Sequence, residues 1–143
     1  MTPPLAEPEL IFVYGTLMRG FSLHRLLDRR ARFVGTGTVE GRLVSLGDYP
    51  GLASGPGGKV HGEIYQAVNP RELLPLLDDA EGYDPRNADA SLFVRETAEV
   101  SMADGSRASA WMYRYNGPLD DAEPVPSGDY RVHRGTPGLQ TTS

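Results

Sequence analysis

The sequence predicts an α+β fold in which short β-strands and two helical segments surround a single hydrophobic core. Short runs of apolar, β-favouring residues recur along the chain, and two segments with leucines at helical spacing interrupt them. Glycine is frequent, at 17 of 143 residues. Because glycines within short strands are typical of bulges and sharp bends, we expect a closed or strongly bent sheet rather than a flat, open one.

Length and composition indicate one domain over residues 1–143, with an ordered core at about 10–130 and loose tails at 1–8 and 131–143. Apolar residues make up 39% of the chain and charged residues 23%, which is typical of globular proteins. The absence of cysteine excludes a disulfide framework, a thiolate metal site and a cysteine nucleophile.

The formal net charge of −5 argues against a nucleic-acid partner, because such binding depends on cationic side chains that meet phosphates. One local group of arginines is explained by the favourable position of cations late in a helix: Arg25, Arg29, Arg30 and Arg32. No segment approaches the ~18 apolar residues of a membrane-spanning helix, and residues 1–9 do not resemble a signal peptide. We therefore expect a cytoplasmic protein with no membrane partner.

The first two elements meet at a glycine-containing loop. Residues 10–14, LIFVY, form a nearly continuous apolar run, which predicts a central strand buried on both faces. The strand ends abruptly at Gly15. Residues 22–30 place Leu23, Leu26 and Leu27 on one helical face, so we expect a helix with Ser22 as its N-cap.

The next strands follow in the middle of the chain. Residues 31–47 alternate in character, and their glycines suggest bulges or close backbone approach. Residues 59–68 read as a strand with Val60 on one side and Glu63 on the other. Alternation alone leaves Glu63 either an outward-facing charge or a group of a binding pocket.

The second helix is predicted over residues 69–85. Asn69, Pro70 and Glu72 match a helix start with a capping box. Pro75 cannot donate a backbone hydrogen bond, so we expect a broken start and a better helix from Pro75 to residue 80. Gly82 supplies the C-terminal stop.

Glu81 lies at the negative end of this helix, close to Asp78 and Asp79. A carboxylate is disfavoured there, so its pKa is expected to rise. A raised pKa suits a general base, whereas the alternative is an ordinary solvated glutamate.

A hairpin is predicted near the C-terminal end. Residues 92–102 and 107–116 read as strands, and 103–106, ADGS, as their turn, because Asp-Gly is a strong turn signal.

Several short motifs, in this order along the chain, resemble the γ-glutamylcyclotransferase-like superfamily, in particular its γ-glutamylamine cyclotransferase and AIG2-like branch. They span about residues 10–130, and their joint order is more specific than any one of them. The motifs are VYGTL (13–17), RG (19–20), YPGL (49–52), VHGEIY (60–65), LDDAEGY (77–83), FVR (93–95), AWMY (110–113) and SGDY (127–130).

The resemblance implies a small mixed β-barrel flanked by short helices. It also implies that Glu81 is the acid/base and that the loop from Tyr14 to Leu17 holds a glutamyl group. Two positions depart from the family pattern: Leu23 stands where relatives often carry Asn, and Phe93 stands where Tyr is frequent. Both departures bear on substrate choice.

The implied reaction is intramolecular. The α-amine of a γ-glutamyl substrate attacks its own γ-carbonyl, which releases 5-oxoproline and a free amine or amino acid. The substrate supplies the nucleophile, so no cofactor or metal is needed. The protein must exchange a proton, stabilise an oxyanion and hold the α-carboxylate. Backbone amides of Gly15, Thr16 and Leu17 suit the last two tasks, because Gly15 lets the ligand approach the backbone without a Cβ in the way.

Other candidates have alternatives of their own. Tyr83 and Tyr113 either line the site or belong to the core, Trp111 is assigned to the core, and Asp129 is expected to be a structural tie in a loop. The three histidines lack the spacing of metal ligands, and a magnesium site at Asp78, Asp79 and Glu81 is a minor alternative.

Two functional hypotheses remain open. The first is the cyclising enzyme, acting on a small-molecule γ-glutamyl substrate as a monomer or weak homodimer. The second is a non-catalytic domain of the same fold that binds small molecules and uses Glu81 to hold an ammonium group.

Overall fold

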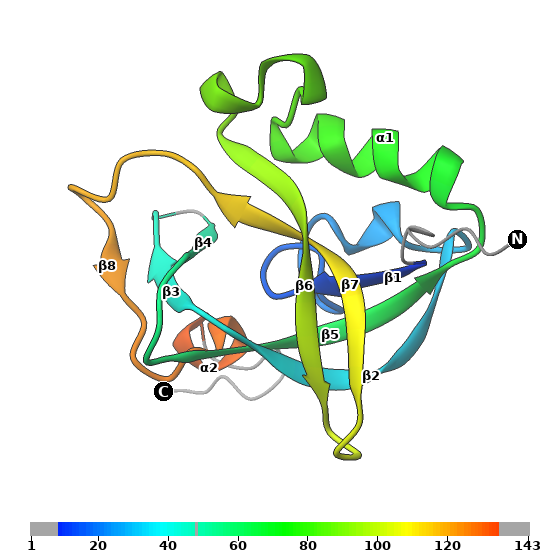
Figure 1. The fold of residues 1–143 in the computed structure, drawn as a ribbon, viewed down its shortest axis with the longest axis horizontal. Helices are drawn as coiled ribbons and strands as arrows, with labels where there is room; N and C mark the ends of the chain where they lie inside the picture. The colour runs from blue at the N-terminus through cyan, green and yellow to red at the C-terminus, as the bar shows by residue number, and fades with distance from the viewer. Residues whose placement is uncertain (1–8, 48, 135–143) are drawn as a thin grey trace, which may run out of the picture.

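A closed five-stranded barrel forms the centre of the protein in the computed structural model, which describes residues 9–47 and 49–134. Neighbouring strands are antiparallel except for β1 and β7, which run parallel, so the barrel is mixed, as predicted. Figure 1 shows the strands wrapping around the core. In barrel order they are β1 (Leu10–Val13), β5 (Lys59–Ala67), β2 (Ala31–Glu40), β6 (Phe93–Met102) and β7 (Arg107–Tyr115).

Residues 31–47 do not form one strand. They divide after Glu40 into β2 of the barrel and β3 (Arg42–Ser45) of a second sheet, which also contains β4 (Pro50–Ala53) and β8 (Glu123–Pro124). The expected bulge is present, since the β2–β5 register shifts between Phe33 and Gly35. The small sheet lies beside the barrel (Figure 1), and its strand β4 forms one wall of the site described below.

Helix α1 (Pro70–Glu81) packs along one side of the barrel and buries Leu73, Leu74 and Leu77. The prediction of a broken start is wrong, because the helix continues through Pro75. Pro75 faces solvent, so the ring avoids the barrel and the helix loses only the bond to the carbonyl of residue 71. Asn69 is the N-cap by position, but its side chain makes no capping hydrogen bond.

The C-terminal end of α1 is as predicted. Gly82 adopts a left-handed conformation with φ of 72°, and the N–H of Tyr83 donates to the carbonyl of Asp78 at 2.9 Å. Two short 3₁₀ segments complete the helical content before the hairpin: η1 (His24–Leu26) and η2 (Pro85–Ala90).

The predicted helix over residues 22–30 is absent. Only the 3₁₀ turn η1 forms there, preceded by Leu23 rather than Ser22 as its N-cap residue. Tight turns bring Leu27 into the core, where it is 1% exposed, and Arg29 adopts a left-handed φ of 65°. The leucine spacing is therefore satisfied by successive turns instead of a regular helix.

The β6–β7 hairpin has the predicted turn over residues 103–106, closed by a hydrogen bond from the N–H of Met102 to the carbonyl of Ser106. After it, α2 (Tyr130–Arg134) occupies part of the expected tail, so the assignment of residues 131–134 to a loose tail is wrong. Asp129 caps α2 by accepting from the N–H groups of Arg131 and Val132, which fits its expected structural role. The remainder of the expected tails, residues 1–8 and 135–143, lies outside the described residues.

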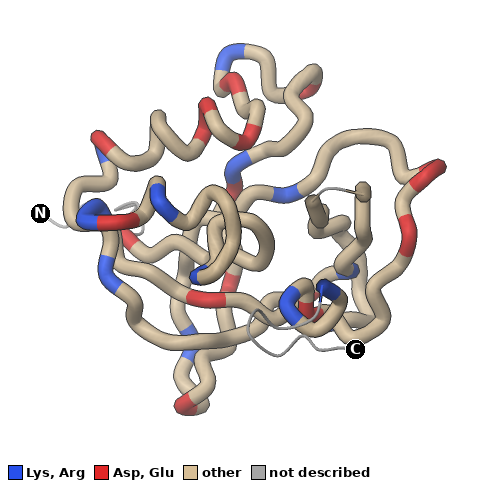
Figure 2. Tube along the Cα trace, turned by 180° about the vertical axis from the view of Figure 1, so that it is seen from behind, with Lys and Arg blue, Asp and Glu red and all other residues tan. Residues whose placement is uncertain are grey.

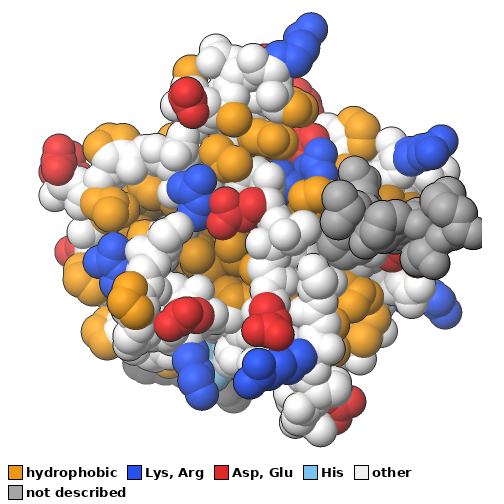
Figure 3. Space-filling model, viewed as in Figure 1, with side chains coloured by type: hydrophobic (Ala, Val, Ile, Leu, Met, Phe, Trp, Pro, Cys, Tyr) orange, Lys and Arg blue, Asp and Glu red, His pale blue; other side chains and the backbone are white. Residues whose placement is uncertain are grey.

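Charged residues of both signs are intermixed along the chain (Figure 2). Apolar side chains line a hollow near the centre of the face drawn in Figure 3. Within the described residues, no helix is long and apolar enough to cross a membrane.

Candidate active site

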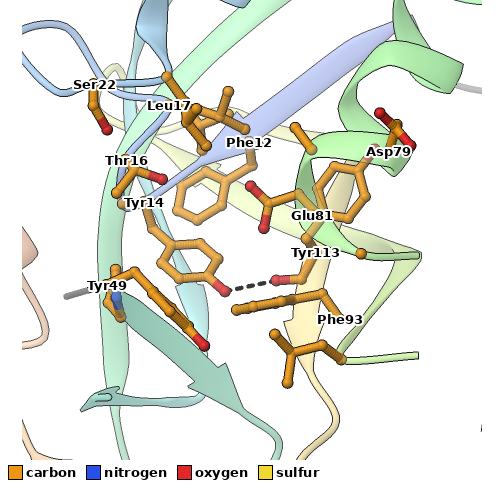
Figure 4. A pocket seen from close by; sticks show the side chains of 17 residues that line it. Phe12, Tyr14, Thr16, Leu17, Ser22, Tyr49, Asp79, Glu81, Phe93 and Tyr113 are labelled. Atoms are coloured by element: carbon orange, nitrogen blue, oxygen red, sulfur yellow. Dashed lines mark hydrogen bonds between the residues drawn. The ribbon is translucent and has the colours of Figure 1, made fainter. Parts of the chain in front are cut away.

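A cavity of about 430 Å³ lies where the end of β1 meets the C-terminal end of α1. The lining comes mainly from the end of β1 and the loop that follows it, from residues 79–82 at the end of α1, from Tyr49 and Pro50 at the start of β4, and from Leu92 and Phe93 at the start of β6. Ser22, Leu23 and Tyr113 complete it. Most of the lining is apolar, and its charged members are Asp79 and Glu81. Figure 4 shows how these side chains converge.

The backbone carbonyl groups of residues 15–17, in the loop after β1, all have hydrogen-bonding neighbours within the protein. The carbonyl of Gly15 accepts from the N–H of Met18 at 3.0 Å, that of Thr16 from the N–H of Leu23 at 2.9 Å, and that of Leu17 lies 3.0 Å from Nδ1 of His24. Among the described residues, the N–H groups of Gly15, Thr16 and Leu17 have no hydrogen-bond partner.

Gly15 and Leu17 are buried, and all three residues line the cavity. A buried amide without a partner costs free energy, so these three successive N–H groups, two of them in buried residues, form a potential site for a negatively charged or carbonyl oxygen. That these amides bind a substrate oxygen stays a prediction.

The expected reason for glycine at position 15 is wrong. A Cβ built there would lie 2.6 Å from Cγ and 3.0 Å from Cδ of Pro50, so the missing side chain makes room for the proline ring rather than for a ligand. Gly15 thus brings β4 against the loop and helps to close the cavity.

Glu81 directs its carboxylate into the cavity, towards the rings of Phe12 and Tyr14 (Figure 4). Burial among these apolar groups raises the pKa of Glu81 to about 7. The predicted direction of the shift is confirmed, and its cause is the desolvation of the carboxylate by burial, which was not predicted from the sequence. Near neutral pH this carboxyl group can therefore both accept and donate a proton.

Tyr14 connects the loop to two strands. Its hydroxyl donates to the carbonyl of Tyr113 at 2.7 Å and accepts from the N–H of Leu52 at 3.0 Å. Burial, and to a smaller extent the charge of Glu81, raises the pKa of Tyr14 well above its usual range. Tyr14 therefore remains a neutral hydroxyl that fixes the cavity wall.

Of the two other tyrosines predicted for the site, Tyr113 lines the cavity and Tyr83 does not. Tyr83 is half-buried and packs against the core, with its ring centroid 5.8 Å from the guanidinium carbon of Arg95. Trp111, assigned to the core, is half-buried and packs against the main hydrophobic cluster.

Glu63 also lies outside the cavity lining, so the structure does not bring it to the predicted binding site. It is only 5% exposed, and three segments hold it: the N–H of Arg19 at 3.0 Å, the hydroxyl of Tyr65 at 2.9 Å and the guanidinium of Arg131 at 2.9 Å. Glu63 therefore ties α2 to the segment that follows the loop. Strand alternation could not predict this, because Arg19 and Arg131 are distant in sequence.

Other lining residues were not anticipated from the sequence. Phe12, Tyr49, Pro50 and Leu92 complete the apolar walls, and no local pattern distinguishes them from core residues. Leu23 and Phe93, the two departures from the family pattern, both line the cavity. Within residues 9–47 and 49–134, no group of three acidic or histidine side chains is placed to hold a metal ion, and Asp78 is instead paired with Arg95.

Comparison with known proteins relates the chain to one family. A family model described as gamma-glutamyl cyclotransferase, AIG2-like, matches residues 11–132. The chain is 31% identical over 121 residues to the gamma-glutamylcyclotransferase family protein YtfP of Escherichia coli K12, covering 84% of this chain and 94% of that protein. It is 30% identical over 125 residues to the gamma-L-glutamyl-butirosin B gamma-glutamyl cyclotransferase of Niallia circulans, covering 87% of this chain and 76% of the other. The crystal structure of an AIG2-like protein from Mus musculus matches with a TM-score of 0.68 at 26% identity, covering 94% of this chain and 95% of that one.

Proposed function

Because the chain belongs to the AIG2-like gamma-glutamyl cyclotransferase family, we propose that it cyclises a γ-glutamyl amide to 5-oxoproline and releases the attached amine or amino acid. The observation that carries the proposal is the meeting of two features in one cavity. A carboxyl group with a pKa of about 7 lines the same cavity as three consecutive residues whose backbone amides have no partner among the described residues.

In the proposed reaction, the carboxylate of Glu81 first takes a proton from the α-ammonium group of the substrate. The freed amine attacks the γ-carbonyl carbon, and a new C–N bond closes the five-membered ring. The carbonyl oxygen becomes an oxyanion, which backbone N–H groups of the loop stabilise. The bond to the leaving nitrogen then breaks as protonated Glu81 donates its proton to that nitrogen. The ring nitrogen still carries one extra proton, which it gives to the carboxylate of Glu81, and the released amine takes up this proton and leaves as an ammonium ion.

The environment of Glu81 suits both proton transfers. An ordinary glutamate, with a pKa near 4.3, is a weak base towards an ammonium group. With its pKa at about 7, Glu81 has a comparable population of both forms at neutral pH. The apolar walls also hold the flexible substrate in a folded geometry, which supplies much of the rate of an intramolecular reaction.

Leu23 and Phe93 bear on the choice of substrate. Both line the cavity and both lack the polar group that is frequent in relatives. Without these groups, the walls offer less hydrogen bonding to a polar leaving group. We therefore propose a γ-glutamyl derivative whose leaving amine makes mainly apolar contacts.

The direct test is a panel of γ-glutamyl amines and γ-glutamyl dipeptides incubated with the protein, with 5-oxoproline detected by mass spectrometry. Enzyme-dependent 5-oxoproline from at least one compound supports the proposal. If ligands bind, as measured by calorimetry, and no compound is cyclised, the alternative of a non-catalytic binding domain is favoured.

A further inference from the structure

Three polar side chains form a cluster behind the last turn of α1, next to Glu81. Asp78 is 7% exposed, and both of its carboxylate oxygens are engaged. Oδ1 accepts from Nε of Arg95 at 2.7 Å and from the hydroxyl of Tyr113 at 2.6 Å, and Oδ2 accepts from Nη2 of Arg95 at 3.2 Å. Asp78 itself does not line the cavity.

The cluster joins α1 to two strands of the barrel. Arg95 comes from β6 and Tyr113 from β7, and the guanidinium carbon of Arg95 lies 4.5 Å from a ring centroid of Trp111. The backbone carbonyl of Tyr113 also accepts the hydrogen bond from Tyr14. A bidentate, stacked arginine has little freedom, so the last turn of α1 is fixed against the barrel wall.

We propose that Asp78, Arg95 and Tyr113 are positioning residues for Glu81. They hold the last turn of α1 in place, and the pairing of Asp78 with Arg95 neutralises the carboxylate next to Glu81. The inference rests on the proposed function, in which Glu81 exchanges protons with the substrate. Residues three apart on a helix are neighbours, so an unpaired Asp78 would oppose ionisation of Glu81. The guanidinium of Arg95 cancels that charge.

The other titratable groups around Glu81 do not change their charge in the test below, so a change in the pKa of Glu81 would come from the Asp78–Arg95 pair. Burial keeps the pKa of both Tyr14 and Tyr113 well above the usual range, so both stay neutral. Asp79 is exposed at the cavity rim and is the same in every variant proposed below. Besides Asp78 and Asp79 on α1 itself, the titratable groups near the end of α1 come from the surrounding segments: Tyr14, Tyr49, Tyr83, Arg95 and Tyr113.

The test is a charge cycle on two residues. The wild type, Arg95→Met, Asp78→Asn and the double variant are labelled with ¹³C at the glutamate carboxyl carbon, and the pKa of Glu81 is measured by NMR. Glu81→Gln identifies the resonance. The readout does not depend on activity.

We expect the pKa of Glu81 to rise by about one unit in Arg95→Met, since a unit charge about 6 Å away at an effective dielectric constant of about 40 has that effect. It is expected to fall by a similar amount in Asp78→Asn, because Arg95 is then unpaired. In the double variant it is expected to return to within about 0.3 unit of the wild type, since both charges are gone.

Arg95→Met leaves a buried carboxylate without its partner, so it is the variant at risk of not folding. If it does not fold, Asp78→Asn and the double variant carry the test, because the fall and the recovery of the pKa are measured without it. Equal pKa values in all folded proteins overturn the inference, and so does a shift of the two single variants in the same direction.

The activity arm separates this inference from the proposed function. In an active enzyme, the acid limb of kcat against pH is expected to move with the pKa of Glu81. If the pKa moves while the limb does not, the charge balance is supported, but Glu81 is not the general base and the proposed function is refuted. If the wild type cyclises no γ-glutamyl compound but the pKa values move as expected, the charge balance is supported and the proposed function is refuted.

Discussion

Glu81→Gln is the substitution that tests the chemistry most directly. It keeps the size and shape of the side chain but removes the group that takes up a proton. If Glu81 is the general acid/base, turnover of a γ-glutamyl amide is expected to fall by roughly 10²–10⁴-fold, the usual contribution of one such group. Because substrate contacts with the loop amides are unaffected, KM is expected to change much less.

The same substitution has a stability signature that follows from the pKa. Below pH 4.5, Glu81 is protonated in both the folded and the unfolded chain and contributes no difference. As the pH rises from 4.5 through 7, the unfolded chain loses the proton first, so the wild type becomes less stable. Above pH 7 the folded state carries the full cost of a buried carboxylate. A rise from 4.5 to about 7, at 1.36 kcal/mol per pKa unit, corresponds to about 3 kcal/mol.

Glu81→Gln removes this pH-dependent cost. The free energy of unfolding of the variant, minus that of the wild type, is therefore expected to increase by about 3 kcal/mol between pH 4 and pH 8. Urea denaturation followed by the fluorescence of Trp111, the single tryptophan, measures both proteins at each pH. Glu40→Gln is the matched control, since Glu40 is exposed at the end of β2, away from the cavity lining.

Two results would refute the reasoning. A stability difference that is the same at pH 4 and pH 8 means that the pKa of Glu81 is not raised. Unchanged turnover in Glu81→Gln, with the variant folded, means that the proton passes through another group.

Three further substitutions test the packing around the cavity. Gly15→Val is expected to lower the free energy of unfolding by about 1–3 kcal/mol, because its Cβ would overlap the ring of Pro50, and Gly15→Val combined with Pro50→Gly is expected to recover part of that loss in the same denaturation assay. Pro75→Ala is expected to raise the melting temperature, because it restores a backbone donor within α1 at an exposed position; an unchanged or lower value means that the proline ring makes a stabilising contact. Arg131→Met is expected to cost about 2–3 kcal/mol by leaving Glu63 without its main partner, with a smaller loss in Arg131→Lys, whereas equal stability of all three proteins would show that the ion pair contributes little.

Features encoded by adjacent residues could be predicted from the sequence. The end of α1 at Gly82 and the turn at residues 103–106 each depend on a glycine in a left-handed conformation, a preference that belongs to the residue itself. The apolar run of β1 likewise predicts a buried strand. The end of α1 places Glu81 and the end of β1 places the loop from Tyr14 to Leu17. The motif resemblance predicts that these two features belong to one site.

Features that depend on distant partners could not be predicted in this way. Leucines at helical spacing in residues 22–30 predict a helix, but the chain meets the core through tight turns whose carbonyl and amide partners include the loop at Thr16. Strand alternation leaves the surroundings of Glu63 open, and only the folded chain shows that the guanidinium of Arg131 pairs with its carboxylate. Gly15 shows the same limit, since its close neighbour is Pro50 of another segment.

The energetic conflicts of this fold are concentrated in the cavity. A carboxylate is disfavoured among apolar groups, and three neighbouring amides find no acceptor in the part of the chain that the structure describes, although the carbonyl groups of the same loop are hydrogen-bonded. Each feature lowers the stability of the free protein, and each is relieved by a ligand with an ammonium group at one end and oxygen acceptors at the other. A γ-glutamyl group has both, arranged on one short chain. A ligand of this kind should therefore raise the melting temperature of the wild type, and do so less in Glu81→Gln, where the attraction for the ammonium group is lost.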